Sequence, residues 1–253
     1  MPNLKLAKLN GKPEIFHTLQ GEGFSVGVPA VFIRSSLCNL HCSWCDTDYT
    51  WNWKNTPWKH QNDSLEGYEK FDKSEYIVEL DTVDIADTIL QYNCPRLILT
   101  GGEPLLQQEA WIDLLKILRQ KNPAFVFEVE TNGTISPTTA FTEFIHQFNV
   151  SPKLSNSENS ETSRHKEHAL KYFSNHKNAW FKFVIAAETD LTEINTIIDN
   201  YSIHKDRVIL MAEGRTLEAL DQRRIWVAEA CKSHGYRFGD RLHIRLWGEK
   251  RGV

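Results

Sequence analysis

The sequence lacks any long hydrophobic run. No stretch of its 253 residues approaches the ~18 consecutive apolar residues that a membrane-spanning helix needs. The N-terminal stretch from Met1 to Asn10 alternates lysine with small apolar residues, and it has no apolar core of the kind found in a secretory signal peptide. Hydrophobic residues make up 41% and charged residues 25%, which is typical of an ordinary globular protein. We therefore expect a cytoplasmic protein with no membrane partner.

The sequence also lacks an excess of positive charge. Lysine and arginine number 29 against 33 aspartates and glutamates, which gives a formal net charge of −4. A general binder of polyanions needs a basic surface to neutralise phosphates. This composition therefore argues against direct binding to nucleic acid and favours a small-molecule substrate.

Cysteine is scarce, and its distribution is uneven. The five cysteines are an odd number, so a disulfide framework fits poorly. Three of them, Cys38, Cys42 and Cys45, have the spacing C-x3-C-x2-C. For the isolated Cys94 and Cys231 we expect no more than a role as small buried side chains.

Three crowded thiols indicate a metal centre. A zinc site is one alternative, because His41 or Asp46 could act as a fourth ligand, but the second cysteine pair of a typical zinc module is absent. An iron–sulfur cluster fits better, and three cysteines would leave one iron of a cubane cluster with an open coordination position. The spacing therefore favours an iron–sulfur centre that is open for chemistry.

Strand-like and helix-like segments alternate every 25 to 30 residues or so along the chain, which is typical of parallel βα units. A right-handed series of this kind forms a full or partial barrel or an open sheet. We expect a single domain over residues 1–253, with an irregular insertion at about 48–76. The expected strands are 14–19, 30–36, 96–100, 125–130, 149–151, 180–185, 207–211 and 241–247, and the expected helices are 84–92, 107–120, 137–148, 162–173, 191–201 and 217–233.

Polar and glycine-rich residues follow several of these strands. Functional residues of parallel α/β proteins gather at the carboxyl ends of the strands. The cysteine triplet, Gly101 to Pro104, Glu130 to Gly133 and Ser151 to Lys153 all have such positions. We therefore expect these motifs to face one pocket.

Individually, several of these residues have ordinary explanations. Gly101-Gly102-Glu103-Pro104 offers bare backbone to a ligand, or simply turns the chain into a helix that starts at Pro104. Thr47 offers a hydroxyl to a hard cation such as Mg²⁺, or caps a helix. The tryptophans of the 48–76 insertion pack over the site, pack onto a partner, or anchor the loop to its own domain, which we favour.

Together, the cysteine spacing and the Gly-Gly-Glu-Pro motif resemble the radical S-adenosylmethionine enzymes. The resemblance extends over most of the chain. It implies a partial TIM-like barrel and a [4Fe–4S] cluster on Cys38, Cys42 and Cys45. The open iron would bind S-adenosylmethionine, whose reductive cleavage gives a radical that abstracts a hydrogen atom from the substrate.

A narrower resemblance is to the 7-carboxy-7-deazaguanine synthase family, which contracts the ring of 6-carboxy-5,6,7,8-tetrahydropterin with loss of ammonia, in deazapurine (queuosine) biosynthesis. It is carried by the Gln-Gly turn, Arg34, Cys-Asp-Thr, Thr-Gly-Gly-Glu-Pro-Leu, Ser-Pro-Lys and the C-terminal stretch from Leu242. The resemblance implies a carbon–nitrogen lyase with Mg²⁺ on Thr47. It implies S-adenosylmethionine binding by Trp44, Cys45, Asp46, Gly101, Gly102, Glu103, Glu130, Ser151, Pro152 and Lys153, and substrate binding by Leu19, Gln20, Gly21, Glu22, Arg34, Thr100 and His243.

The family resemblance further implies an external, flavodoxin-like one-electron donor and a homodimer. One departure concerns the end of the chain, because ten residues follow His243, which argues against a role for the terminal carboxylate of Val253. Two alternatives stay open at this point. One is a glycyl-radical-enzyme activase, which carries the same cysteine and Gly-Gly-Glu-Pro motifs, and the other is a non-catalytic iron–sulfur or zinc binding module.

Overall fold

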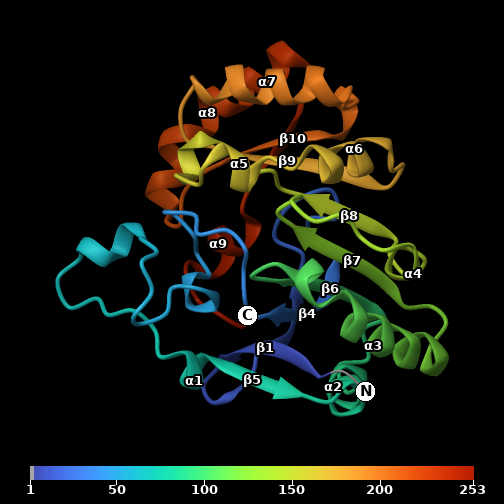
Figure 1. Ribbon diagram of the computed structural model, residues 1–253. Coiled ribbons are helices and arrows are strands. Elements are labelled where there is room, and N and C mark those ends of the chain that lie inside the picture. Colours follow the sequence, from blue (N-terminus) through green and yellow to red (C-terminus); the bar gives the residue numbers. More distant parts are fainter. Residues whose placement is uncertain (1–2) are drawn as a thin grey trace.

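A computed structural model describes residues 3–253, so Met1 and Pro2 of the expected single domain lie outside the described residues. One eleven-stranded sheet runs through the molecule in the order β11-β10-β9-β8-β7-β6-β4-β1-β2, with β3 paired to β4 and β5 paired to β1 (Figure 1). The strands are β1 (Leu4–Leu9), β2 (Lys12–Pro13), β3 (Ile15–Leu19), β4 (Pro29–Ser35), β5 (Ile77–Leu80), β6 (Arg96–Gly101), β7 (Val126–Thr131), β8 (Gln147–Val150), β9 (Ala179–Ile185), β10 (Val208–Ala212) and β11 (Arg237–Gly239).

The strands from β4 to β11 in this order, without β5, form a parallel series that curves but does not close. Each pairs in parallel with its neighbour. Within residues 3–253, β11 pairs only with β10, whereas β4 at the other end is bordered by the antiparallel strands β1 and β3. The predicted parallel α/β fold with a partial barrel is therefore confirmed.

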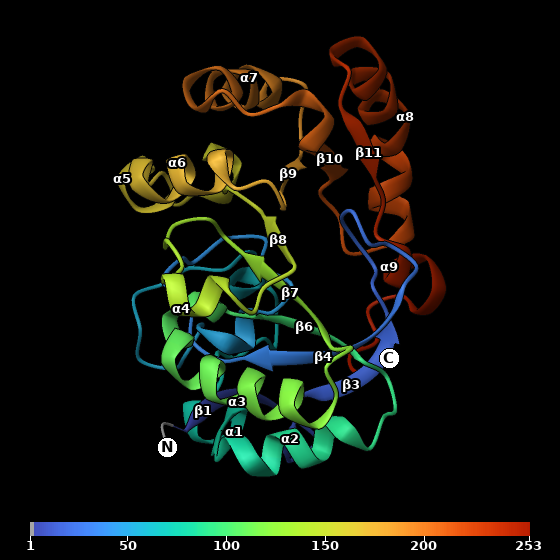
Figure 2. The ribbon, with the colours of Figure 1, turned by 90° about the vertical axis from the view of Figure 1, so that its right-hand side faces the viewer.

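Helices cover the outer side of the curved sheet (Figures 1 and 2). The larger ones are α2 (Thr82–Leu90), α3 (Gln108–Lys121), α6 (Glu167–Asn175), α7 (Asp190–Tyr201) and α8 (Leu217–His234). Local sequence signals define their ends: Asp81 and Thr216 cap the first turns of α2 and α8, and Gly235 ends α8 in the left-handed conformation.

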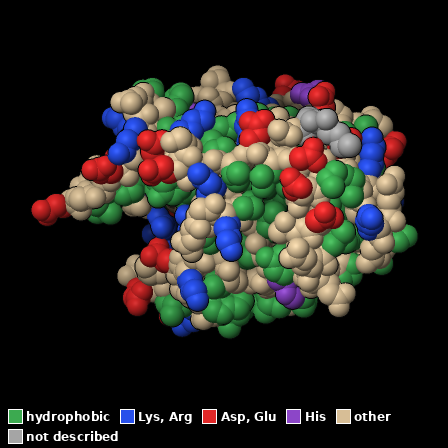
Figure 3. Space-filling view, turned by 90° about the horizontal axis from the view of Figure 1, so that it is seen from below, with side chains coloured by type: hydrophobic (Ala, Val, Ile, Leu, Met, Phe, Trp, Pro, Cys, Tyr) green, Lys and Arg blue, Asp and Glu red, His purple; other side chains and the backbone are tan. Residues whose placement is uncertain are grey.

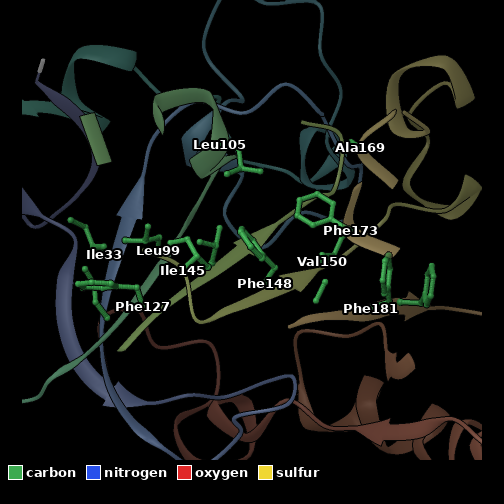
Figure 4. Close-up of a cluster of buried hydrophobic side chains, with 14 of the residues drawn as sticks. Ile33, Leu99, Leu105, Phe127, Ile145, Phe148, Val150, Ala169, Phe173 and Phe181 are labelled. Atoms are coloured by element: carbon green, nitrogen blue, oxygen red, sulfur yellow. The ribbon is translucent and has the colours of Figure 1, made fainter. Parts of the chain in front are cut away.

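The main hydrophobic core lies between these helices and the sheet. Alternate residues of the parallel strands point into it, among them Phe127, Phe148 and Phe181, each fully buried (Figure 4). Burying a side chain of this size stabilises the fold by about 1.5–3 kcal/mol. The intervening residues of the same strands face the inside of the partial barrel, and the site is built there.

One predicted strand is wrong. Residues 242–247 form the helix α9 (Leu242–Trp247), so His243 and Arg245 lie on a helix, and the last strand is β11. The amide groups of Ile244 and Arg245 donate to the carbonyl of Arg241, at 3.0 and 3.2 Å. The apolar residues alternate over only five positions here, which is too short a stretch to separate a strand from a short helix.

Other differences are smaller. The helix expected over 137–148 is much shorter in the structure, where α4 spans only Thr139–Thr142 and β8 already begins at Gln147. The helix expected over 162–173 is divided into α5 (Glu161–Arg164) and α6. The sequence did not indicate β1, β2 or β5. Cys231 is buried as expected, whereas Cys94 is half-buried, and both are free thiols.

The segment 48–76 is largely irregular and projects to one side in Figure 1. It contains only short helical turns, η1 (Asp48–Thr50), η2 (Gln61–Ser64) and α1 (Lys73–Tyr76). Trp51 and Trp53 are buried and Trp51 also lines the cavity described below, whereas Trp58 is 42% exposed.

Side chains of both charge signs are interspersed on the face seen in Figure 3, in keeping with the small net charge. Among the described helices, none has both the length and the apolar character to cross a membrane.

Candidate active site

A cavity at the carboxyl ends of the parallel strands is lined by most of the residues singled out from the sequence. They are Gln20, Glu22, Arg34, Cys38, Cys42, Trp44, Cys45, Asp46, Thr47, Thr100, Gly101, Gly102, Glu130, Ser151 and Lys153. Of the remaining five, Leu19, Gly21 and His243 line a second cavity that shares Gln20, Arg34 and Thr47 with the first. Glu103 and Pro152 line neither cavity.

The three cysteines sit on the loop that follows β4. The sulfur of Cys38 accepts a hydrogen bond from the amide of Leu40 at 3.5 Å, and the sulfur of Cys42 accepts one from the Asn159 side chain at 3.3 Å. Burial raises the pKa of all three thiols, that of Cys45 to about 12. Buried thiols of this kind become thiolates when a metal takes the place of the proton.

The spacing of side chains favours a cluster over a single ion. No group of three or more His, Cys, Asp or Glu side chains in residues 3–253 is arranged to hold one metal ion. Zinc needs four ligands converging on one point, whereas a cubane cluster takes each thiolate at a different iron. The donor set of three thiols around a shared cavity therefore fits an iron–sulfur cluster.

Gly101 and Gly102 allow the end of β6 to pack directly on the cysteine loop. A Cβ atom on Gly102 would lie 1.9 Å from the carbonyl oxygen of Leu37, and one on Gly101 would lie 2.1 Å from that of Ser35. Gly101 also has a φ of 128°, which L side chains rarely adopt. The amide of Gly102 donates to Ser35 at 3.0 Å, so it is already used within the protein.

Glu103 lies inside the protein and not on the cavity wall. Its side chain is fully buried and accepts hydrogen bonds from the Thr131 hydroxyl at 2.8 Å and the amides of Asn132 and Leu105 at 2.7 and 3.0 Å. Burial raises the pKa of this carboxyl. In this position Glu103 ties the end of β6 to the end of β7.

Two cations inside the cavity were not singled out from the sequence. Lys182, on β9, pairs with Glu22 and lies 3.2 Å from Glu130. Arg241 pairs with Asp46 and lies 2.9 Å from Glu22. A lysine in the middle of the apolar stretch Trp-Phe-Lys-Phe-Val-Ile was a signal for Lys182, because charges are almost never buried without a partner.

These cations set the charge of the carboxylates. Burial alone would raise the pKa of Glu22, but Lys182 and Arg241 hold it well below its usual range. Likewise, the charge of Arg241 overcomes burial and lowers the pKa of Asp46. For Glu130 burial outweighs the attraction of Lys182, and its pKa is raised. The cavity therefore contains an ionised Glu22 beside a Glu130 that is easier to protonate.

Hydrogen bonds and an ion pair connect the carboxylates of the cavity to further polar side chains inside the partial barrel. Glu130 accepts hydrogen bonds from Gln20 at 3.0 Å and from Asn149 at 2.9 Å. Deeper in the partial barrel, the fully buried Glu128 pairs with Arg96 and accepts from the Ser25 hydroxyl at 2.6 Å. The inner faces of β7 and β8 thus hold a continuous polar network.

Thr47 occupies the first position before η1, but its side chain does not cap that turn. Its hydroxyl lies 3.5 Å from the sulfur of Cys45, on the wall shared by both cavities. Lys153 also lines the first cavity, where its ammonium lies 3.0 Å from the Ser151 hydroxyl and over the ring of Trp44, 5.4 Å from its centroid.

The C-terminal residues fold back onto the second cavity, where His243 and Val253 both contribute to the wall. Arg251 pairs at 2.7 Å with Glu14, which also holds Arg34 at 3.0 Å. The ten residues that follow His243 do not carry Val253 away from the site, because the chain turns back towards it.

Comparison with known proteins agrees with this geometry. A family model described as a 4Fe-4S single cluster domain matches residues 19–172. The 7-carboxy-7-deazaguanine synthase of Pyrobaculum aerophilum is 33% identical over 94% of this chain and 95% of its own length. That of Halobacterium salinarum is 33% identical over 93% of this chain and 90% of its own length. The crystal structure of QueE from Escherichia coli shares the fold, with a TM-score of 0.66 and 23% identity over 95% of both chains.

A parallel partial barrel whose strand ends carry a three-cysteine cluster loop and a Gly-Gly-Glu-Pro turn defines a radical S-adenosylmethionine enzyme. Within that class, the chain belongs to the 7-carboxy-7-deazaguanine synthase family.

Proposed function

We propose that the protein is a carbon–nitrogen lyase that converts 6-carboxy-5,6,7,8-tetrahydropterin to 7-carboxy-7-deazaguanine with loss of ammonia. The observation that carries the proposal is the convergence of the cysteine loop, Thr47, Arg34 and the Gly101–Gly102 backbone on one cavity. A single substrate in this cavity would have access to the cluster, to the Thr47 hydroxyl as a ligand for a hard cation, and to Arg34 as a partner for a carboxylate.

The cluster would be held by Cys38, Cys42 and Cys45. The sulfurs of Cys38 and Cys42 already accept hydrogen bonds from the surrounding chain, and that of Cys45 lies 3.5 Å from the Thr47 hydroxyl. When bound, the cluster and S-adenosylmethionine together supply the one-electron chemistry that removes a hydrogen atom from the substrate. The contribution of the protein is to orient both molecules and to limit access of water.

For S-adenosylmethionine, Lys153 supplies a cation for the carboxylate, and Trp44 and Ser151 lie beside it. An ammonium group only donates, so that of the ligand would meet carbonyl oxygens at the end of β6. The ionised Asp46 and the carboxyl of Glu130 are acceptors for further donors of the cofactor. Glu103 and Pro152, which lie off the cavity wall, would act by fixing the neighbouring strand ends.

The substrate would lie between Arg34, Thr100 and the Gln20–Glu22 turn. A pterin ring presents adjacent N–H donors at one edge, and the ionised carboxylate of Glu22 accepts such donors. Arg34 carries the charge to pair with the substrate carboxylate, and Leu19, Gly21 and His243 would bound the same end. The hydroxyl of Thr47 does not cap η1, and it would join a magnesium shell that also contains substrate oxygens.

We further propose a cytoplasmic enzyme that receives its electron from a flavodoxin-like protein and functions as a homodimer. Its five cysteines are free thiols, which supports a reducing compartment. Light scattering on the purified protein tests the dimer, and reduction of the cluster by flavodoxin under anaerobic conditions tests the donor.

The test of the main proposal is anaerobic reconstitution with iron and sulfide, followed by incubation with a reductant, S-adenosylmethionine, Mg²⁺ and the carboxylated tetrahydropterin. We expect 7-carboxy-7-deazaguanine and ammonia in equal amounts. Cleavage of S-adenosylmethionine without that product would reject the proposed substrate and leave a protein-directed activase as the alternative. Absence of cleavage would reject a radical enzyme altogether.

A further inference from the structure

The irregular segment 48–76 contacts the cysteine loop, and the proposed reaction assigns no role to its residues 58–63, which lie off the wall of both cavities. The ring Nε2 of His60 lies 2.8 Å from the carbonyl oxygen of Cys45. The next residue, Gln61, donates its amide to the carbonyl of Ser43 at 2.8 Å. Two successive residues of the segment thus hold the backbone on which the third cysteine sits.

The direction of the His60 hydrogen bond follows from its partners. A carbonyl oxygen only accepts, so Nε2 must carry the proton. The other ring nitrogen, Nδ1, accepts from the amide of Asn62 at 3.2 Å and lies 3.4 Å from Asp48. In the neutral and in the charged ring alike, His60 therefore donates to Cys45.

The ring is held in place by a buried polar group. His60 is 4% exposed, and Asp48 beside it accepts a hydrogen bond from the Tyr68 hydroxyl at 2.5 Å. The side chain of Asn52 donates to Tyr68 at 3.0 Å and to Asp63 at 3.1 Å. A ring fixed on both sides in this way is suited to fixing the peptide that it contacts.

A second contact covers the other end of the loop. The ring of His41, between Cys38 and Cys42, stacks on Trp58 with centroids 3.7 Å apart and planes within 6°. Its edge also meets Trp51, at 5.1 Å. The segment therefore contacts the cysteine loop at two places, at His41 and at the backbone of Ser43 and Cys45.

We propose that the 48–76 segment is a support for the cluster loop and that His60 is its positioning residue. The hydrogen bond to Cys45 fixes the peptide plane between Cys45 and Asp46. It thereby sets the direction of the Cys45 sulfur on one side and of Thr47 on the other. This inference rests on the cluster assignment of the proposed function but not on the identity of the substrate.

The test compares His60→Phe, which removes the donor, with His60→Gln, whose side-chain amide donates from nearly the same position. Tyr68→Phe is the matched control, because it loosens the same buried group and leaves the bond to Cys45 intact. Each protein is reconstituted anaerobically, and two properties are measured. These are the rate of iron release to a chelator and the electron paramagnetic resonance spectrum of the reduced cluster with S-adenosylmethionine.

We expect His60→Phe to release iron about tenfold faster than the wild type and to shift the spectrum, since residues behind metal ligands typically matter by 10–100-fold. We expect His60→Gln and Tyr68→Phe to keep both properties near the wild type. Equal changes in His60→Phe and Tyr68→Phe would overturn the inference, because they would mean general loosening. A His60→Phe protein with the iron release and the spectrum of the wild type would also overturn the inference.

Should His60→Phe fail to fold, His60→Met takes its place and is judged by the same two measurements against His60→Gln. These readouts need no pterin. A protein that makes no deazaguanine but shows the expected differences would reject the proposed substrate and leave the role of His60 standing.

Discussion

The two faces of the same parallel strands differ sharply in chemistry. Towards the helices, β7, β8 and β9 present Phe127, Phe148 and Phe181, all fully buried in the apolar core. Towards the inside of the partial barrel, they present Glu130, Asn149 and Lys182, among others, held to one another by hydrogen bonds and ion pairs. The outer face holds the sheet and helices together, and the inner face forms the site.

The polar inner face accompanies a barrel that stays open. A closed barrel of this size fills its interior with packed side chains. Here the inner layer is polar and surrounds a cavity, and the inner residues remain in place because each charge has a partner. Substitutions on the outer face should therefore lower the stability of the fold, whereas substitutions on the inner face should lower activity.

The largest effect on folding is expected on the outer face. Phe148→Ala should lower the free energy of unfolding by about 3–5 kcal/mol, because it leaves a cavity in a tightly packed core. Urea denaturation of the cluster-free protein measures this. The activity of each molecule that remains folded and loaded should stay close to that of the wild type. A loss of activity without a loss of stability would contradict the division between the faces.

The second largest effect on folding is expected for Gly102→Ala, because the added Cβ would collide with the backbone carbonyl of Leu37. Overpacking of this kind costs about 1–3 kcal/mol. The cysteine loop should shift with it, so we expect reduced iron content after reconstitution. Gly235→Ala is the control, since its left-handed φ of 75° is strained but nothing lies within 4 Å of the added atom. Normal iron content in Gly102→Ala would refute this account of the loop.

Thr47→Ala should leave folding and iron content unchanged and weaken the response of the enzyme to Mg²⁺. We expect about tenfold more Mg²⁺ for half-maximal activity, the lower end of what changes near a metal usually cost. Thr50→Ala is a nearby comparison, because its hydroxyl is already bonded to the carbonyl of Thr47 at 2.7 Å. An unchanged magnesium response in Thr47→Ala would show that the assignment is wrong.

The smallest effect concerns pH. The folded-state pKa of Glu22 is below its unfolded value, so its contribution to stability is present above about pH 4.3 and is lost as the pH falls. Glu22→Gln should therefore flatten the decline of stability between about pH 5 and pH 3, by roughly 1 kcal/mol. Chemical denaturation at several pH values measures it. An identical decline in both proteins would mean that Lys182 and Arg241 do not stabilise the ionised form.

The sequence was informative where a motif is local. The cysteine triplet, the Gly-Gly-Glu-Pro turn and most strands could be placed, because short spacings and apolar runs carry that information. Polar residues also alternate with apolar ones within β7, β8 and β9, and this alternation is the signal for an inward-facing polar layer that includes Lys182.

Other features depend on contacts between distant residues. Arg241 follows the last strand and reaches Asp46, 195 positions earlier in the chain. The return of the C-terminal residues to Glu14, and the bond from His60 to Cys45, have no local sequence signature either. Such pairings become apparent only when the strands are assembled, because nothing in a local pattern specifies which partner a charged side chain will meet.

The most direct test of the account compares two neighbours on β9, Phe181 and Lys182, which point to opposite faces. Phe181→Leu and Lys182→Gln are reconstituted, verified as folded by circular dichroism at low temperature, and assayed for deazaguanine formation per cluster. We predict turnover within about threefold of the wild type for Phe181→Leu and a loss of about 100-fold or more for Lys182→Gln. Equal losses in the two variants, or full activity in Lys182→Gln, would contradict the separation of folding and function between the two faces.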